Sequence, residues 1–147
     1  MTFFKYITIY ILSLLYIIVG CKHLIHPEFF TAIVPPFFIY KKEIVLISGV
    51  LEIILGLSLL FKETRKIGSW GIILLLISIF PANIYLYISE IPRQELNISR
   101  TQALIRMPFQ IPLIILAYWH SQKSETEILS IICSILFVPT IIYFLTI

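Results

Sequence analysis

The chain has 147 residues, of which 59% are hydrophobic and 13% are charged, and this balance excludes a water-soluble domain because too little polar surface is left to cover its exterior. The length leaves no room for a separate catalytic module beside a membrane domain. The formal net charge of +3 comes from lysines and arginines dispersed between apolar runs, without the basic block or stripe that nucleic-acid binding requires, so the expected partner is the lipid bilayer and no nucleic acid.

Five apolar runs have the length that a helix needs to cross the hydrocarbon core of a bilayer, which is about 20 residues. The runs are 3–19, 44–61, 67–88, 103–119 and 128–145. Together they predict a multi-pass protein of the cell inner (plasma) membrane. The predicted fold class is therefore all-α: an integral membrane helical bundle with a four-helix domain over 1–120 and an additional C-terminal transmembrane helix at 128–145.

The first run is open to a second interpretation as a secretion signal. Lys5, the apolar stretch after it and Ile18-Val19-Gly20-Cys21 are similar to a bacterial lipoprotein signal, whose processing would remove the first helix. Signal peptides seldom precede several further spans, and this run has the length of a short transmembrane helix, so we favour a retained span. Cys21 and Cys133 lie far apart and form no C-x-x-C pair, so no thiol chemistry is expected within the chain.

The connection at 23–42 differs from the short polar turns at 62–66 and 120–127, which are typical of antiparallel neighbours in a bundle. It is rich in phenylalanine and contains Pro35-Pro36, which suits a segment that lies in the membrane interface or dips into the bundle. The connection at 89–102 is hydrophilic. Lysines and arginines are almost evenly divided between the two predicted sides, so the positive-inside rule determines the orientation only weakly. If Lys22 and Arg106 are set aside as part of a buried site, the short turn at 62–66 favours a cytoplasmic N-terminus.

Glu52 lies in the middle of the second run, roughly 13 Å along the helix axis from the start of that span. A lone ionisable side chain in hydrocarbon costs from about 3 to more than 10 kcal/mol, so such a residue faces the bundle interior and needs a partner. Gly49 and Gly56 share the helix face of Glu52. We expect them to let a neighbouring backbone approach closely on either side of the carboxylate.

Four further polar residues interrupt or bound the apolar runs, namely His23, Asn83, Arg106 and Gln110. The end of the first span, the start of the second, the end of the third and the start of the fourth must lie on the same side of the membrane. The four residues can therefore surround a cavity whose floor is Glu52 and whose lid is the connection at 23–42. We expect Arg106 to extend inward and pair with the Glu52 carboxylate.

The same cluster has a structural interpretation. Glu52 and Arg106 can form a buried ion pair, with Asn83 and Gln110 as interhelical hydrogen-bonding residues. His23 by itself is more often an interfacial histidine than a metal ligand, and His26 adds no carboxylate at ligand spacing, so we predict no metal site. No residue is predicted to be catalytic.

Several spaced motifs follow one another along the chain. They are Gly20-x-x-His23-x-x-x-Pro27-x-Phe29-Phe30, Ile33-Val34-Pro35-Pro36, Ile47-Ser48-Gly49-Val50-x-Glu52-Ile53-x-x-Gly56, Trp70-Gly71, Phe80-Pro81-Ala82-Asn83-Ile84, Arg106-x-Pro108-x-Gln110 and Ala117-Tyr118-Trp119. Together they resemble the DoxX family of small bacterial and archaeal membrane proteins, from about Phe3 to His120. The resemblance implies a four-helix membrane core, and members of that family are linked to quinone-dependent oxidation of sulfur compounds, to membrane redox complexes and to maturation of periplasmic dehydrogenases. Two features depart from the family pattern: Lys22 stands where relatives often carry asparagine, and the run at 128–145 lies outside it.

Two hypotheses of function follow. In the first, the chain is a quinone-linked or redox-associated accessory subunit that binds a hydrophobic ligand, with Glu52 as proton acceptor or polar anchor and the other four polar residues around it. No haem, iron–sulfur or flavin motif is evident, so electron transfer would need the quinone or a membrane or periplasmic redox partner, and the chain is not expected to be a complete enzyme alone. In the second, it is a non-catalytic binding or assembly protein whose polar cluster is structural. A small transporter is disfavoured because no inverted repeat is evident.

Overall fold

The computed structural model describes residues 3–124 and 126–146, and within these ranges the chain forms helices joined by short connections, with no strand. The helices are α1 (Phe3–Ile25), α2 (Pro27–Thr31), α3 (Lys41–Leu60), α4 (Arg65–Ile88), α5 (Glu90–Glu95), α6 (Arg100–Ser121) and α7 (Glu127–Thr146). Four of them, α1, α3, α4 and α7, are long and apolar enough to cross a membrane. The predicted all-α class is confirmed, and the four apolar helices agree with a multi-pass membrane protein. A fifth crossing, by α6, stays a prediction.

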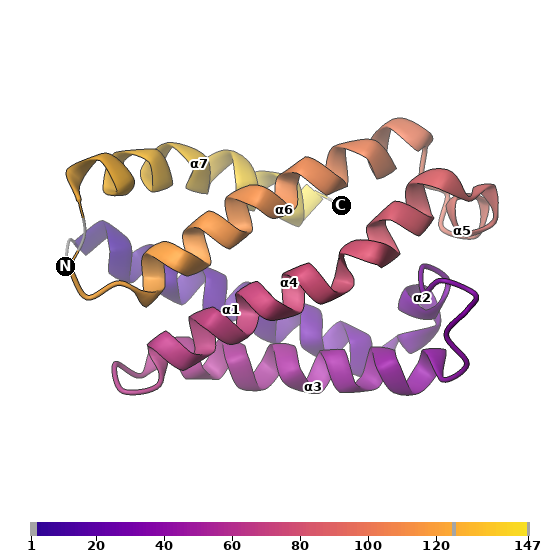
Figure 1. Ribbon diagram of the computed structural model, residues 1–147, viewed down its shortest axis with the longest axis horizontal. Helices are drawn as coiled ribbons and strands as arrows, with labels where there is room; N and C mark the ends of the chain where they lie inside the picture. The colour runs from indigo at the N-terminus through magenta and orange to yellow at the C-terminus, as the bar shows by residue number, and fades with distance from the viewer. Residues whose placement is uncertain (1–2, 125, 147) are drawn as a thin grey trace.

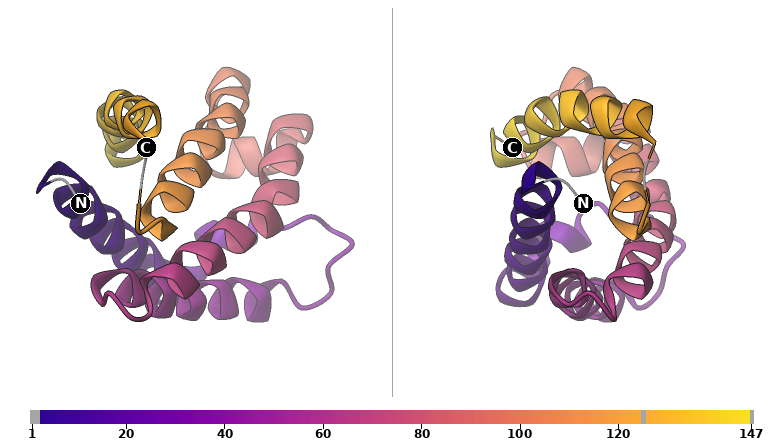
Figure 2. Two further views of the ribbon diagram at one scale, coloured as in Figure 1. Left: turned by 60° about the vertical axis from the view of Figure 1, so that its left-hand side comes forward. Right: turned by 90° about the vertical axis from the view of Figure 1, so that its left-hand side faces the viewer.

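The five long helices follow one another around a ring, which Figure 2 shows end-on in its right-hand view. α1 packs on α3, α3 on α4, α4 on α6 and α6 on α7. The rings of Phe4 and Phe137 meet edge to face with centroids 6.0 Å apart, which brings α7 back against α1. The short helices α2 and α5 lie at one end of the bundle, opposite the end that holds the N-terminus (Figure 1).

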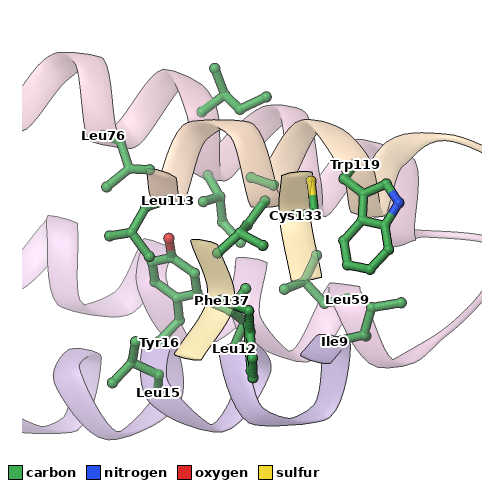
Figure 3. Close-up of a cluster of buried hydrophobic side chains, with 14 of the residues drawn as sticks. Ile9, Leu12, Leu15, Tyr16, Leu59, Leu76, Leu113, Trp119, Cys133 and Phe137 are labelled. Carbon is green, nitrogen blue, oxygen red and sulfur yellow. The ribbon is translucent and has the colours of Figure 1, made fainter. Parts of the chain in front are cut away.

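The interior of the ring is apolar along much of its length (Figure 3). All five long helices contribute buried side chains to it, among them Ile9, Leu12, Leu59, Ile72, Leu116, Trp119, Cys133 and Phe137. The outward faces are apolar too, and large hydrophobic side chains such as Ile67, Leu74, Ile111, Ile135 and Ile142 are more than half exposed. In water such faces would associate, whereas in a bilayer they contact lipid chains.

Two helix ends differ from the sequence prediction. α1 continues past Val19 to Ile25, so that His23 lies in the last turn of the helix and not after it. α6 begins at Arg100, before the apolar run, because Ser99 and Gln102 form a capping box: Ser99 Oγ accepts from Gln102 N at 3.2 Å and Gln102 Oε1 accepts from Ser99 N at 2.8 Å. Apolar runs therefore predict the spans but not the caps.

α1 and α3 approach closely along a line of small residues. A Cβ atom added at Gly49 would lie 2.9 Å from the carbonyl oxygen of Gly20 and 2.7 Å from His23 Cβ. A Cβ atom at Gly56 would lie 3.0 Å from the carbonyl oxygen of Ser13, whose hydroxyl donates to the Gly56 carbonyl at 2.6 Å. The predicted close approach on either side of Glu52 is confirmed, and the neighbour is α1.

Candidate functional site

A cavity of about 890 Å³ lies between the helices at the end of the bundle where α2 and α5 are found. Its lining includes all five polar residues that the sequence brings together, namely His23, Glu52, Asn83, Arg106 and Gln110. Small-molecule sites typically have volumes of about 300–1,000 Å³ and apolar walls with a few polar groups. The predicted gathering of these residues around one cavity is confirmed, and the cavity has the size of a ligand pocket.

Glu52 is 5% exposed and lies in close contact with His23. His23 Nδ1 lies 2.9 Å from Glu52 Oε2 and also 2.9 Å from the carbonyl oxygen of Val19, one turn earlier in α1. The ring N–H is directed at the Val19 carbonyl, so Glu52 Oε2 accepts no hydrogen bond from any described residue. The contact is an ion pair only when the imidazole is protonated, and this oxygen receives no hydrogen bond from a described residue.

The predicted pairing of Glu52 with Arg106 is wrong in this structure. Within the described ranges Arg106 makes no ion pair, and it lies in the cavity wall on α6. The reason is the order of the helices around the ring: α4 separates α3 from α6, whereas α1 packs directly on α3 through Gly20 and Gly49. Counting membrane crossings assigns a residue to a leaflet but does not identify its neighbours.

Gln110 joins two helices across the cavity. Its Nε2 donates to the Leu76 carbonyl at 3.0 Å, in the turn of α4 that precedes Pro81, while its buried Oε1 has no hydrogen-bond partner in the described part of the chain. Asn83 follows Pro81 by two residues and is also buried, and none of the hydrogen bonds between described residues involves its side-chain amide. The polar side of the cavity thus contains amides whose hydrogen-bonding capacity is only partly used.

Tyr16 is a pocket residue that the sequence prediction missed. It is buried in α1 and lines the cavity, and its hydroxyl has no hydrogen-bond partner among the residues described. Figure 3 shows the hydroxyl directed toward Leu113 and Leu76. A signal existed, because Tyr16 and His23 are seven residues apart and therefore share one helix face. A tyrosine inside an apolar run gives no other sign that its hydroxyl is buried.

The connection after α1 covers the cavity, as the lid interpretation predicts. Phe30 of α2 stacks on His23, with ring centroids 3.6 Å apart and planes inclined by 25°. Val34, in the same connection, is buried and lines the cavity. The outer residues of the segment, Phe37 and Ile39, are 72% and 87% exposed. One side of the segment thus closes the pocket while the other faces the surroundings of the bundle, in keeping with an interfacial segment.

The pocket lies within a region that a protein-family model recognises. A domain of unknown function, DUF8561, matches residues 12–121. The chain belongs to the DUF8561 family. Curated proteins and solved structures yield no match to this chain. The matched region runs from the middle of α1 to the last residue of α6, so it includes all five predicted pocket residues and Tyr16, and it leaves α7 outside.

A second polar cluster, at the end of the bundle opposite the pocket, was not expected from the sequence. Lys5 and Thr8 are fully buried, and Thr8 Oγ1 lies 3.0 Å from Nε2 of His120, which is itself buried. Lys5 Nζ donates to the Gln122 carbonyl at 3.0 Å and lies 5.1 Å from the ring centroid of Trp119. These contacts join the start of α1 to the end of α6. Lys5 is therefore a buried residue that connects two helices, and not only a charge that flanks a span.

Proposed function

We propose that this membrane protein binds a hydrophobic ligand with a polar head group in the cavity, as an accessory subunit linked to quinone or to a membrane redox system. The observation that carries the proposal is that three buried polar atoms around one ligand-sized cavity have no hydrogen-bond partner among the described residues: Glu52 Oε2, Gln110 Oε1 and the Tyr16 hydroxyl. Each unpaired buried group costs about 1–3 kcal/mol, and folded proteins rarely retain several together. A bound head group would supply the missing partners.

The cavity divides into a polar part and an apolar part that suit such a ligand. Glu52 is the proton acceptor or polar anchor, held in place by contact with His23, and Arg106, Asn83 and Gln110 offer N–H donors to the head group. Apolar side chains from several helices complete the lining and would contact a hydrocarbon tail: Leu15, Val19, Leu76, Ile79, Leu113 and Phe144. The Phe30 lid closes the pocket beside His23.

We place α6 in the bilayer together with the four more apolar helices. Its 22 residues span about 33 Å, which matches the hydrocarbon core. Its buried Gln110 faces the ring interior, whereas Leu104, Ile111 and Tyr118 on its outer side are exposed and apolar. Five crossings of the inner membrane, with a DoxX-like four-helix core and α7 beside it, are part of this proposal. The quinone link rests on the DoxX resemblance, and the electrons would pass to or from a partner protein.

The proposal is tested by native mass spectrometry and lipid extraction of the detergent-purified protein. Wild type is compared with Glu52→Gln and Arg106→Ala, and with Glu63→Gln as a control that makes the same change at an exposed carboxylate outside the pocket. We expect wild type and the control to retain a defined small lipid and the two pocket variants, while still folded, to lose it. Empty wild-type protein, with pocket variants that only melt earlier, would contradict the proposal.

The alternative is a non-catalytic binding or assembly protein whose polar cluster is structural. The bond from Gln110 to Leu76 joins α6 to α4, and the contact of His23 with Glu52 joins α1 to α3. In this alternative, the sole role of both contacts is to hold the helices in register. Under this alternative, Glu52→Gln lowers the melting temperature without changing the lipid content. Genes for a dehydrogenase or a sulfur-oxidising enzyme beside the gene of this protein would favour the redox-linked function instead.

A further inference from the structure

Two buried oxygen atoms in the pocket receive no hydrogen bond from a described group. Glu52 Oε2 is one of them, because the N–H of His23 is used by the Val19 carbonyl. Gln110 Oε1 is the other. The orientation of the Gln110 amide is fixed by chemistry, since its other end faces the Leu76 carbonyl at 3.0 Å and only an N–H can donate there. The pocket therefore offers one permanent acceptor, Gln110 Oε1, and a second, Glu52 Oε2, when the carboxylate is ionised.

The pocket also contains groups that can donate to the head group. The Tyr16 hydroxyl is buried, unpaired and able either to donate or to accept, and Arg106 has donors only. A head group with carbonyl oxygens alone would satisfy these donors but leave Gln110 Oε1, and the ionised form of Glu52, without a donor. A hydroxyl group donates one hydrogen bond and accepts another, so it can satisfy an acceptor and a donor at once.

We infer that the pocket selects a ligand whose head group carries a hydroxyl that donates to Glu52 or Gln110, and that in a quinone pair it binds the hydroquinone in preference to the quinone. This inference rests on the proposed ligand-binding function and deepens it. A site built to hydrogen-bond a hydroxyl discriminates strongly against an analogue without it, because its own buried polar groups are then left unpaired. The pocket thus holds the reduced form of the pair.

The test measures dissociation constants by calorimetry, without oxygen, on the whole protein in lipid nanodiscs. The probes are decylubiquinol, decylubiquinone, the dimethyl ether of decylubiquinol, and geranylgeraniol as a hydroxyl compound that is not a quinol. We expect decylubiquinol to bind at least tenfold more tightly than decylubiquinone and the ether, a difference of about 1.4 kcal/mol. The preference should shrink to threefold or less in Glu52→Gln or in Gln110→Leu, and stay unchanged in Glu63→Gln.

The outcomes separate this inference from the proposed function. Equal binding of decylubiquinol and decylubiquinone, or a preference that survives in both pocket variants, overturns the inference while ligand binding stands. Binding of geranylgeraniol without decylubiquinol supports the hydroxyl head group and removes the quinone link. Failure of all four probes to bind overturns the inference together with the proposed function. Because two pocket variants are used, the loss of one to misfolding still leaves the other as a test.

Discussion

The environment of Glu52 determines what this carboxylate can do. It is buried among apolar helices, where a charge without compensation is costly, and His23 lies in close contact with it. His23 in turn is held by the Val19 carbonyl within its own helix and by the ring of Phe30 above it. These two contacts fix the imidazole, and the imidazole in turn limits the movement of the Glu52 carboxylate. Because the His23 N–H donates to Val19, Glu52 Oε2 can still accept a hydrogen bond from a ligand.

Gln110→Leu separates the structural role of this amide from its role toward a ligand. The substitution removes the hydrogen bond from Gln110 Nε2 to the Leu76 carbonyl, which joins α6 to α4. Interhelical hydrogen bonds in membranes contribute about 0.6–2 kcal/mol, so we expect a loss of that size in the free energy of unfolding, measured by titration with a denaturing detergent. Gln94→Leu, at an exposed position on α5, is the control and should change it little. A Gln110→Leu variant as stable as wild type would show that the bond contributes nothing.

The sequence predicts the members of the pocket better than their partners. All five polar residues line one cavity because the number of crossings fixes which helix ends share a leaflet. The pairing of Glu52 depends on which helices are adjacent, and the sequence pattern does not contain that order, so Arg106 was expected where His23 lies. The sequence also did not predict that Tyr16 and Lys5 are buried polar groups with specific surroundings. An aromatic residue in a membrane helix and a lysine near its end are both common, so neither indicates a site by itself.

At the scale of the helices, the contact of α1 with α3 is what brings His23 to Glu52. The two backbones approach at Gly20 and Gly49, and a side chain at either position would displace one helix. The glycine pattern around Glu52 indicates this contact from sequence. The ends of α1 and α6 could not be read in the same way, because Ile25 and Arg100 lie beyond the apolar runs and their helical state depends on local caps and packing.

Gly49→Ala tests the α1–α3 contact. The added methyl group would lie 2.7 Å from His23 Cβ and 2.9 Å from the Gly20 carbonyl oxygen, and neither atom is at the end of a flexible side chain, so the helices must separate. Overpacking of this kind costs about 1–3 kcal/mol, and we expect that loss in the free energy of unfolding, together with loss of any co-purifying lipid.

Gly71→Ala is the matched control for Gly49→Ala. Its added methyl group would meet only the side chain of Leu55, which can change rotamer, so we expect a change below about 1 kcal/mol. Equal destabilisation by the two substitutions would mean that replacing glycine by alanine destabilises this bundle wherever it is made. The α1–α3 contact beside Glu52 would then not be the cause of the effect of Gly49→Ala.

In the whole molecule, polar contacts concentrate at the two ends of the ring and the middle is apolar. The pocket residues occupy the end near α2 and α5, while Lys5, Thr8 and His120 fasten α1 to α6 at the other end. α1 takes part in both clusters, so it links the pocket to the opposite end of the bundle. The predicted bundle is confirmed as a class from apolar runs alone, whereas the second cluster depends on contacts between residues more than a hundred positions apart, which no local pattern reveals.

The number of crossings is the property of the whole molecule that decides where the pocket faces. If α6 crosses the bilayer, the turn after α3 and the turn after α6 lie on one side and α5 lies on the other. We expect Lys62→Cys and Lys123→Cys, made in a chain with both native cysteines replaced by alanine, to react with a membrane-impermeant maleimide from one side of intact vesicles. Gln94→Cys should react only from the other side, since all three positions are exposed. Labelling of positions 94 and 123 from the same side would mean that α6 does not cross the bilayer. The polar pocket, which α6 helps to line, would then be open to water and would not be an intramembrane site.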